Sequence, residues 1–132
     1  MIDMHCHLLW NVDDGPKTIE ATVNMLEQAV KEGITTLIAT PHSNHPQYDV
    51  NYETVINQIG LLQNELQSQS IPLTLYSGHE VRLSEKIMER YHTKQIHTLA
   101  NSHYLLLELP ADTIPSYTKH IIHALLLEGI TP

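Results

Sequence analysis

The sequence predicts an α/β protein in which parallel strands alternate with helices. Short apolar runs rich in β-branched residues are typical of buried strands. Each is followed by a stretch whose apolar residues recur at helical spacing. Four such units succeed one another along the 132 residues, with no linker, low-complexity segment or clear internal repeat. Consecutive parallel strands are joined by right-handed crossovers, so we expect the helices to lie outside the sheet.

The chain begins with a strand, a helix and a second strand. Residues 1–7 (MIDMHCH) are predicted to form a short strand. Residues 18–33 are predicted to form a helix, because Gly33 suits the left-handed position that ends a helix. The apolar face of this helix consists of Ile19, Val23, Leu26 and Val30. Residues 34–40 (ITTLIAT) are apolar and β-branched, which indicates a buried strand that ends at Pro41.

The middle of the chain repeats this order. Residues 53–69 are predicted to form a helix with one apolar face. That face consists of Val55, Ile59, Leu62 and Leu66. Residues 71–81 (IPLTLYSGHEV) are predicted to form the third strand. Residues 84–92 then indicate a short helix, with Ser84 as its N-terminal cap.

The last part of the chain supplies the fourth unit. Residues 93–103 are polar and poorly periodic, which predicts a loop with at most one helical turn. Residues 104–109 (YLLLEL) are predicted to be a strand, and residues 115–130 a helix that Gly129 closes. Its inward face is expected to hold Ile121, Ile122, Leu125 and Leu126. Residues 130–132 stand where a fifth strand should begin, so we expect a truncated chain.

Composition excludes several classes of function. The formal net charge is −8, which argues against nonspecific binding of nucleic acid or of anionic membranes. No apolar run approaches the roughly 20 residues of a membrane helix, and no signal peptide is visible. A single cysteine excludes an internal disulfide framework. These features favour a soluble cytoplasmic protein.

Residues that can bind metals lie at the carboxyl ends of all four predicted strands. They are His5, His7, His42, Glu80 and Glu108. Sites of parallel α/β folds form at those ends, so we expect these side chains to share one site. Alternate strand residues share a face, which places His5, His7 and Asp3 together. An H-x-H pair of this kind is a natural chelate for a divalent transition metal.

Each candidate also has a plainer structural interpretation. Asp13 and Asp14 precede a Gly-Pro pair and a helix, where acidic residues commonly form turns and complement the helix dipole. His42 follows a proline and fits a structural loop residue, while His45 fits a solvated one.

The third and fourth strands allow a choice between candidates. His79 should face away from Glu80, so at most one of them lines the common site, and we select Glu80. Glu108 stands among leucines, where an ionised carboxylate needs a cation or an ionic partner. Lys and Arg together number only 7, so a metal is favoured.

The cysteine between the two histidines does not indicate a thiol phosphatase. Such enzymes use the pattern H-C-x5-R, in which the arginine holds the phosphate. His5-Cys6 begins the pattern, but Val12 occupies the arginine position. Cys6 is therefore expected to be a small buried apolar residue.

With these residues placed, the sequence resembles the PHP (polymerase and histidinol phosphatase) superfamily. Within it, the chain is similar to the metal-dependent tyrosine-protein phosphatases of bacterial capsule and exopolysaccharide clusters. The matching stretches are "IDMHCHLL", "VDDGPKTIEATVNML", "AVKEGITTLIATPH", "IPLTLYSGHEVRL" and "YLLLELP". The D-x-H-x-H pattern is shared across the superfamily, whereas D-D-G-P with A-T-P-H and G-x-E is more specific.

The resemblance implies the N-terminal portion, residues 1–132, of a single distorted (β/α)7 barrel domain with a trinuclear metal centre. The metal is commonly manganese, and the ligand types also suit iron or zinc. The implied ligands are His5, His7, Asp14, His42, Glu80 and Glu108. Asp3 is a candidate for orienting one of the ligand imidazoles without binding the metal itself. A metal-bound hydroxide is expected to attack phosphorus.

The chain also departs from the family pattern. Trp10-Asn11 replaces the usual Pro-Gly, and Ser43 stands where a second histidine is common. The family's later A-H-P-E-R and D-x-H motifs, with a phosphate-binding arginine, are absent. The resemblance therefore implies a weak or inactive fragment, with open sheet edges that favour self-association.

The substrate implied by the resemblance is a phosphotyrosine protein, a bacterial tyrosine kinase in particular. A phosphatase acting on a small phosphomonoester such as histidinol phosphate is the alternative within enzymes. A non-catalytic, metal-binding half-barrel is the alternative outside them. A plain α/β domain whose histidines are satisfied within the core is a third interpretation.

Overall fold

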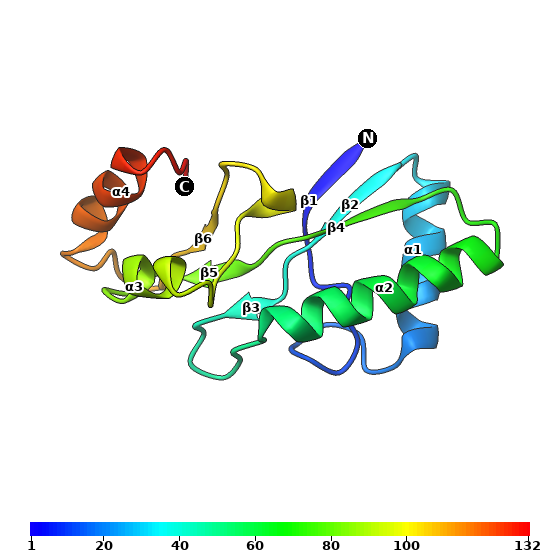
Figure 1. Ribbon diagram of the computed structural model, residues 1–132. Coiled ribbons are helices and arrows are strands. Elements are labelled where there is room, and N and C mark those ends of the chain that lie inside the picture. The colour runs from blue at the N-terminus through cyan, green and yellow to red at the C-terminus, as the bar shows by residue number, and fades with distance from the viewer.

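The computed structural model describes residues 1–132 as an α/β fold with two parallel sheets (Figure 1). The strands are β1 (Ile2–Cys6), β2 (Thr36–Ala39), β3 (His42–Ser43), β4 (Thr74–Ser77), β5 (Glu80–Arg82) and β6 (Leu106–Glu108). The helices are α1 (Ile19–Lys31), α2 (Tyr52–Ser68), α3 (Ile87–His92) and α4 (Thr118–Leu127). A short 3-10 turn, η1, spans Leu99–Asn101 within the predicted loop. The α/β class and the parallel pairing are confirmed, and the sheets do not close into a barrel.

The chain passes between the two sheets three times, from β2 to β3, from β3 to β4 and from β4 to β5. One sheet has the order β1-β2-β4 and the other has the order β3-β5-β6, and every pairing is parallel. The prediction of one strand over residues 71–81 was therefore wrong, because β4 and β5 belong to different sheets.

Two local features account for the two crossings that have no helix between the strands, β2 to β3 and β4 to β5. Pro41 separates β2 from β3, and its missing N–H interrupts the ladder. Between β4 and β5, a Cβ atom on Gly78 would lie 2.9 Å from the Cδ2 atom of Leu99, so η1 packs closely there only because residue 78 is glycine. The backbone amide of Glu80 donates to the carbonyl of Pro41 (3.1 Å), which links the two breaks.

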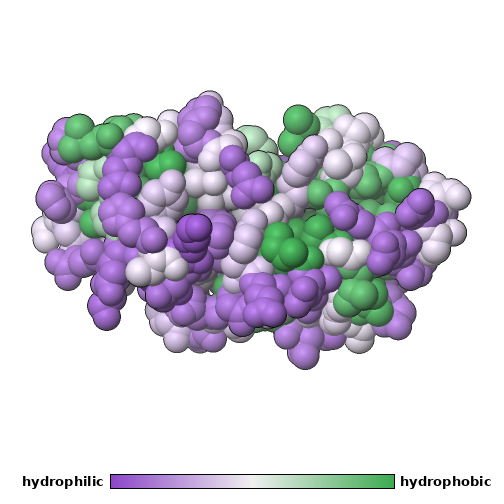
Figure 2. Space-filling model, in the orientation of Figure 1, coloured by the Kyte–Doolittle hydropathy of each residue, from purple (hydrophilic) through white to green (hydrophobic).

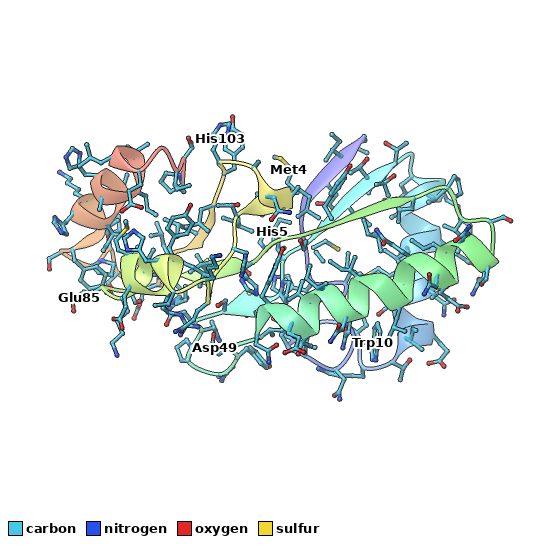
Figure 3. The ribbon with its side chains drawn as sticks, viewed as in Figure 1. Met4, His5, Trp10, Asp49, Glu85 and His103 are labelled. Atoms are coloured by element: carbon cyan, nitrogen blue, oxygen red, sulfur yellow. The ribbon has the colours of Figure 1, made fainter.

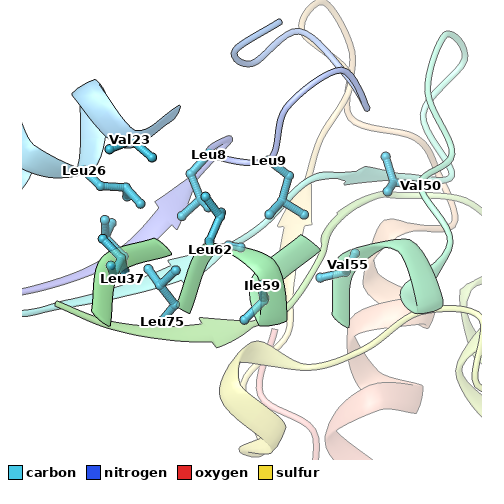
Figure 4. Close-up of a cluster of buried hydrophobic side chains, with 12 residues drawn as sticks. Leu8, Leu9, Val23, Leu26, Leu37, Val50, Val55, Ile59, Leu62 and Leu75 are labelled. Carbon is cyan, nitrogen blue, oxygen red and sulfur yellow. The ribbon is translucent and has the colours of Figure 1, made fainter. Parts of the chain in front are cut away.

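A hydrophobic core lies between the first sheet and helices α1 and α2 (Figure 4). The Thr18 hydroxyl caps α1 by accepting from the amide of Ala21, and the Asn51 side chain caps α2 by accepting from the amide of Thr54. All four residues of the predicted apolar face of α2 are buried, as are Leu8 and Leu9 after β1. This core fixes the carboxyl end of β1, where the two histidines stand.

A second, smaller core lies between β5, β6, α3 and α4. Ile121 and Leu125 of α4 face it, as predicted, but Leu126 is 52% exposed. The helix α4 ends before Gly129, whose positive φ of 77° matches the predicted C-terminal role. Residue Ser84 does not cap α3, which begins at Ile87. Figure 1 shows this core at the opposite end of the molecule from α1.

The outer strands of both sheets keep a free edge. β1 pairs only with β2, and β6 pairs only with β5. Thr131 forms an isolated parallel bridge with Tyr104, at the place where a fifth strand was expected to begin. On the face drawn in Figure 2, hydrophobic residues emerge in separate patches among hydrophilic ones. None of the four helices has the length and apolar character needed to cross a bilayer.

Candidate metal centre

The six side chains named as candidate ligands converge where the two sheets adjoin. They form three overlapping groups, within each of which the ligand atoms lie within 4.8 Å of one another. The groups are His5-His7-Glu80, His7-Asp14-His42 and His42-Glu80-Glu108. In Figure 3, His5 lies in the middle of the molecule, between its two ends. The crossings between the sheets create this meeting point, because they bring β3 and β5 next to the end of β1.

One carboxylate oxygen lies at the centre of the cluster. The Oε2 atom of Glu80 lies 2.9 Å from the Nε2 atom of His7. It lies 3.3 Å from the Nε2 atom of His5 and 3.3 Å from the Nδ1 atom of His42. The two Nε2 atoms of His5 and His7 are themselves 3.2 Å apart. Such crowding of nitrogen and oxygen lone pairs is repulsive unless protons or a cation lie between them.

The carboxylate of Asp13 sets the orientation of the His7 imidazole. Its Nδ1 atom lies 3.1 Å from the Oδ2 atom of Asp13, whose side chain is fully buried. A neutral imidazole that donates from Nδ1 presents a lone pair at Nε2, toward Glu80. Asp13 also accepts from the backbone amides of Gly15 (3.0 Å) and His42 (3.0 Å). It thereby connects the end of β1, the following turn and β3.

These contacts shift the titration of both residues. The hydrogen bond to Asp13 raises the pKa of His7, against the opposing effect of burial, and the nearby carboxylates add to the rise. Burial by itself raises the pKa of Asp13, but the hydrogen bonds from His7, Gly15 and His42 outweigh it and lower that pKa. Asp13 is therefore an ionised, buried carboxylate.

Asp3, which was expected to orient an imidazole, makes a different contact. The Oδ1 atom of Asp3 accepts from the backbone amide of His5 (3.1 Å), so it constrains the strand, whereas Asp13 contacts an imidazole. Asp13 had been interpreted as a turn residue. The one sequence signal is the Asp-x-Gly spacing of Asp13 and Gly15, which favours the Asx contact between this carboxylate and the amide of Gly15.

Asp14 lies on the solvent side of the same cluster. Its side chain is 58% exposed, with Oδ1 3.1 Å from the Nδ1 atom of His7 and Oδ2 3.7 Å from the Nε2 atom of His42. Asp14 therefore faces the cluster from the solvent side, whereas its buried neighbour Asp13 contacts the imidazole of His7.

Glu108 has an ionic partner as well as a place in the cluster, although the sequence favoured a metal over such a partner. Its Oε1 atom lies 2.5 Å from the Nη1 atom of Arg82. Its Oε2 atom lies 3.6 Å from the Nδ1 atom of His42. Glu108 therefore reaches both the arginine and the cluster.

The donor set fits a divalent transition metal. The Nδ1 atom of His42 and the Oε2 atom of Glu108 are buried and have no hydrogen-bond partner, which is costly for polar atoms that bind nothing. Three imidazoles and three carboxylates, joined in groups that share His7, His42 and Glu80, match ligands that suit Mn, Fe or Zn.

The other candidates occupy different environments. Cys6 is half-buried against the first core, and burial raises the pKa of its thiol to about 11, so it is a poor nucleophile. His79 is fully buried and faces Tyr52 and His97, away from the site, as predicted. His45 is half-exposed, and its ring stacks on that of His42 at a centroid distance of 4.5 Å.

Comparison with known proteins places this geometry in a family. The chain is 38% identical over 132 residues to a putative tyrosine-protein phosphatase CapC of Staphylococcus aureus, and 34% identical to the tyrosine-protein phosphatase YwqE of Bacillus subtilis. Each match covers 100% of this chain and 52% of the relative. The chain thus spans about half the length of these relatives.

A solved structure gives the same result. This chain superposes with a TM-score of 0.93 and 34% identity on a chain from crystal structures of YwqE from Bacillus subtilis and CpsB from Streptococcus pneumoniae, described as unique metal-dependent tyrosine phosphatases. The match covers 98% of this chain and 52% of that one. A family model for capsular polysaccharide synthesis, CpsB/CapC, matches residues 1–132. The chain therefore belongs to the CpsB/CapC family.

Proposed function

We propose that this chain carries the metal-binding half of a phosphomonoester hydrolase that acts as a tyrosine-protein phosphatase in the control of polysaccharide synthesis. The observation that carries the proposal is the arrangement of three overlapping ligand groups, two of which share the Oε2 atom of Glu80. Related chains named as tyrosine-protein phosphatases support the choice of reaction.

The proposed ligands are those that converge at the site: His5, His7, Asp14, His42, Glu80 and Glu108. The proposed metal is Mn²⁺, with iron or zinc as alternatives, because imidazole and carboxylate ligands suit all three. When bound, such metals supply a water of lowered pKa and neutralise the phosphate oxygens.

Other contacts in this chain orient the proposed ligands and leave one side of the cluster open. Asp13 holds the His7 imidazole in one orientation, and the buried amide of His42 fixes the same carboxylate. Asp14 and His5 stand at the open side of the cluster, with side chains 58% and 50% exposed, where a phosphate group can approach. The excess of carboxylates favours metal cations before the anionic substrate binds.

The proposed substrate is a phosphotyrosine protein, such as the tyrosine kinase that regulates polysaccharide assembly, and the proposed location is the cytoplasm, in keeping with a chain of one cysteine. Because the side chains of His5 and Asp14 are half-exposed, the site is open to solvent, which weakens the electrostatic stabilisation of a transition state. We therefore expect the 132-residue chain alone to bind metal and to hydrolyse phosphomonoesters slowly or not at all.

The test combines metal analysis with an assay of p-nitrophenyl phosphate in added Mn²⁺. We expect more than one metal per chain and weak turnover. His5→Ala should reduce both, whereas His120→Ala, on the exposed surface of α4, should change neither. Fewer than one metal per chain would contradict the proposed multinuclear centre. Robust turnover that is lost in His5→Ala would instead contradict the expected low activity of the chain.

A small phosphomonoester such as histidinol phosphate is the second candidate substrate, since the open site accepts either. Comparing the turnover of a phosphotyrosine peptide with that of histidinol phosphate separates the two. Metal binding without turnover of either would favour the non-catalytic, metal-binding alternative.

A further inference from the structure

The two oxygen atoms of the Glu108 carboxylate have different surroundings. Arg82 and Glu108 are direct neighbours across the parallel pair β5 and β6. The Nη1 atom of Arg82 lies 2.5 Å from Oε1 and also donates to the backbone carbonyl of Leu109 (3.3 Å). The Oε2 atom faces His42 Nδ1 at 3.6 Å, is buried, and has no hydrogen-bond partner. One oxygen is thus occupied by the guanidinium while the other is presented to the cluster.

Arg82 is itself held from the opposite side. Its backbone carbonyl accepts from the Nδ2 atom of Asn44 (2.9 Å), which also donates to the hydroxyl of Ser84 (2.8 Å). Asn44 has a left-handed φ of 59°, and its amide donates to Asp49 (2.8 Å). A side-chain amide therefore ties the loop after β3 to β5 and keeps Arg82 opposite Glu108.

We propose that Arg82 is a positioning residue that holds Glu108 as a ligand through one oxygen only. The inference rests on the proposed metal centre. A glutamate has three rotatable side-chain bonds, and without the guanidinium its carboxylate is free to turn from His42 or to offer both oxygens to a cation. A planar guanidinium fixes a carboxylate more firmly than a lysine ammonium does.

The test measures Mn²⁺ binding to the 132-residue chain by calorimetry in three variants. Arg82→Gln should weaken at least one binding step by about 10- to 100-fold, the usual effect of losing a residue that orients a ligand. Arg82→Lys should recover only part of this loss. The charge-matched control is Lys119→Gln, which removes one positive charge from an exposed position of α4 and should leave metal affinity within about threefold of wild type.

The visible absorption spectrum of bound Co²⁺ provides a second measurement, which a change in protein stability alone does not alter. This spectrum reports the geometry of the ligands, so we expect an altered spectrum in Arg82→Gln and an unchanged one in Lys119→Gln. Circular dichroism checks folding, and Arg82→Lys provides the measurement if Arg82→Gln does not fold.

The outcomes separate the two proposals. Wild-type protein that binds no metal overturns the metal centre and this inference with it. Metal binding that is equal in wild type, Arg82→Gln and Arg82→Lys overturns the positioning role alone. Equal losses in Arg82→Gln and Lys119→Gln also overturn it, because they indicate a general effect of charge.

Discussion

The Nδ1 atom of His7 lies 3.1 Å from the Oδ2 atom of Asp13, a carboxylate whose side chain has no exposed surface. An ionised group in this position is tolerable only because the protein supplies all its partners. Two backbone amides and one imidazole do so, from three separate segments of the chain. The pair therefore connects the geometry of the site with the stability of the fold.

Replacing Asp13 by alanine should destabilise the protein by about 2–3 kcal/mol, since two buried amides and the imidazole lose their acceptor. Urea unfolding followed by circular dichroism, without metal, measures the change. Asp14→Ala is the matched control, because that carboxylate is largely exposed, and it should change stability by less than about 0.5 kcal/mol. A similar loss in both variants would mean that charge, rather than the buried network, decides the effect.

His79 should make the stability of the metal-free protein depend on pH. Burial, with a smaller contribution from His97, lowers its pKa from 6.5 to about 4. Between these values the unfolded chain binds a proton that the folded protein excludes, so acid favours unfolding. The stabilising effect is complete above pH 6.5 and is lost as the pH falls toward 4, by about 3 kcal/mol in all.

The variant His79→Asn isolates this effect. Asparagine does not titrate, and its side-chain oxygen can replace the Nδ1 acceptor that receives the amide of His97 (3.2 Å). Unfolding free energies measured in EDTA from pH 7 to 4 should therefore fall less steeply in this variant than in wild type. His103→Asn, at an exposed position, should keep the wild-type slope. An unchanged slope in His79→Asn would exclude His79 as the source.

How far the sequence predicts this molecule depends on whether a feature is local. All four residues of the apolar face of α2 were predicted correctly, because the helical periodicity can be recognised within 17 consecutive residues. The convergence of His5, His42 and Glu80 followed from the general placement of sites at strand ends. Both conclusions needed no knowledge of contacts between distant segments.

The features that were not predicted are contacts between segments that lie far apart in the sequence. The separation of β4 from β5 depends on how η1 packs on Gly78, 21 residues before Leu99 in the chain. The partner of Glu108 stands on another strand, 26 residues away, where a residue count cannot place it. Asp13 is buried only because β3 returns beside the first turn. No periodic pattern encodes these relationships.

The free edge of β1 should allow self-association. Met4 is 60% exposed on this outer strand (Figure 3) and lines an apolar groove of about 600 Å³ with Ile2, Tyr104 and Leu106. We expect a second copy of the chain to cover this edge. The net charge of −8 on each copy opposes this association, so added salt should favour it. Met4→Lys should raise the dissociation constant by about tenfold or more in sedimentation equilibrium.

The control for this prediction is Ile56→Lys, which adds the same charge at an exposed position of α2, 46% exposed and outside the groove. It should leave the dissociation constant near the wild-type value. A monomer at all concentrations and salt levels, or equal weakening by both variants, would contradict association through the β1 edge.

Two glycines provide a paired test of how the site is built. A Cβ atom on Gly15 would clash with the backbone carbonyl oxygen of His7, so Gly15→Ala must displace either the turn or the histidine. A Cβ atom on Gly60, inside α2, would meet nothing within 4 Å. We expect Gly60→Ala to stabilise the protein by about 1 kcal/mol, because alanine favours the helix.

Gly15→Ala should instead lower stability and weaken Mn²⁺ binding together, since the clash acts on the backbone of a proposed ligand. Urea unfolding and calorimetry on both variants measure the two effects. If Gly15→Ala were destabilised while its metal affinity stayed at the wild-type value, the turn would be independent of the ligands. The close approach of Gly15 to His7 predicts the opposite, because the amide of Gly15 and the imidazole of His7 share one carboxylate, that of Asp13.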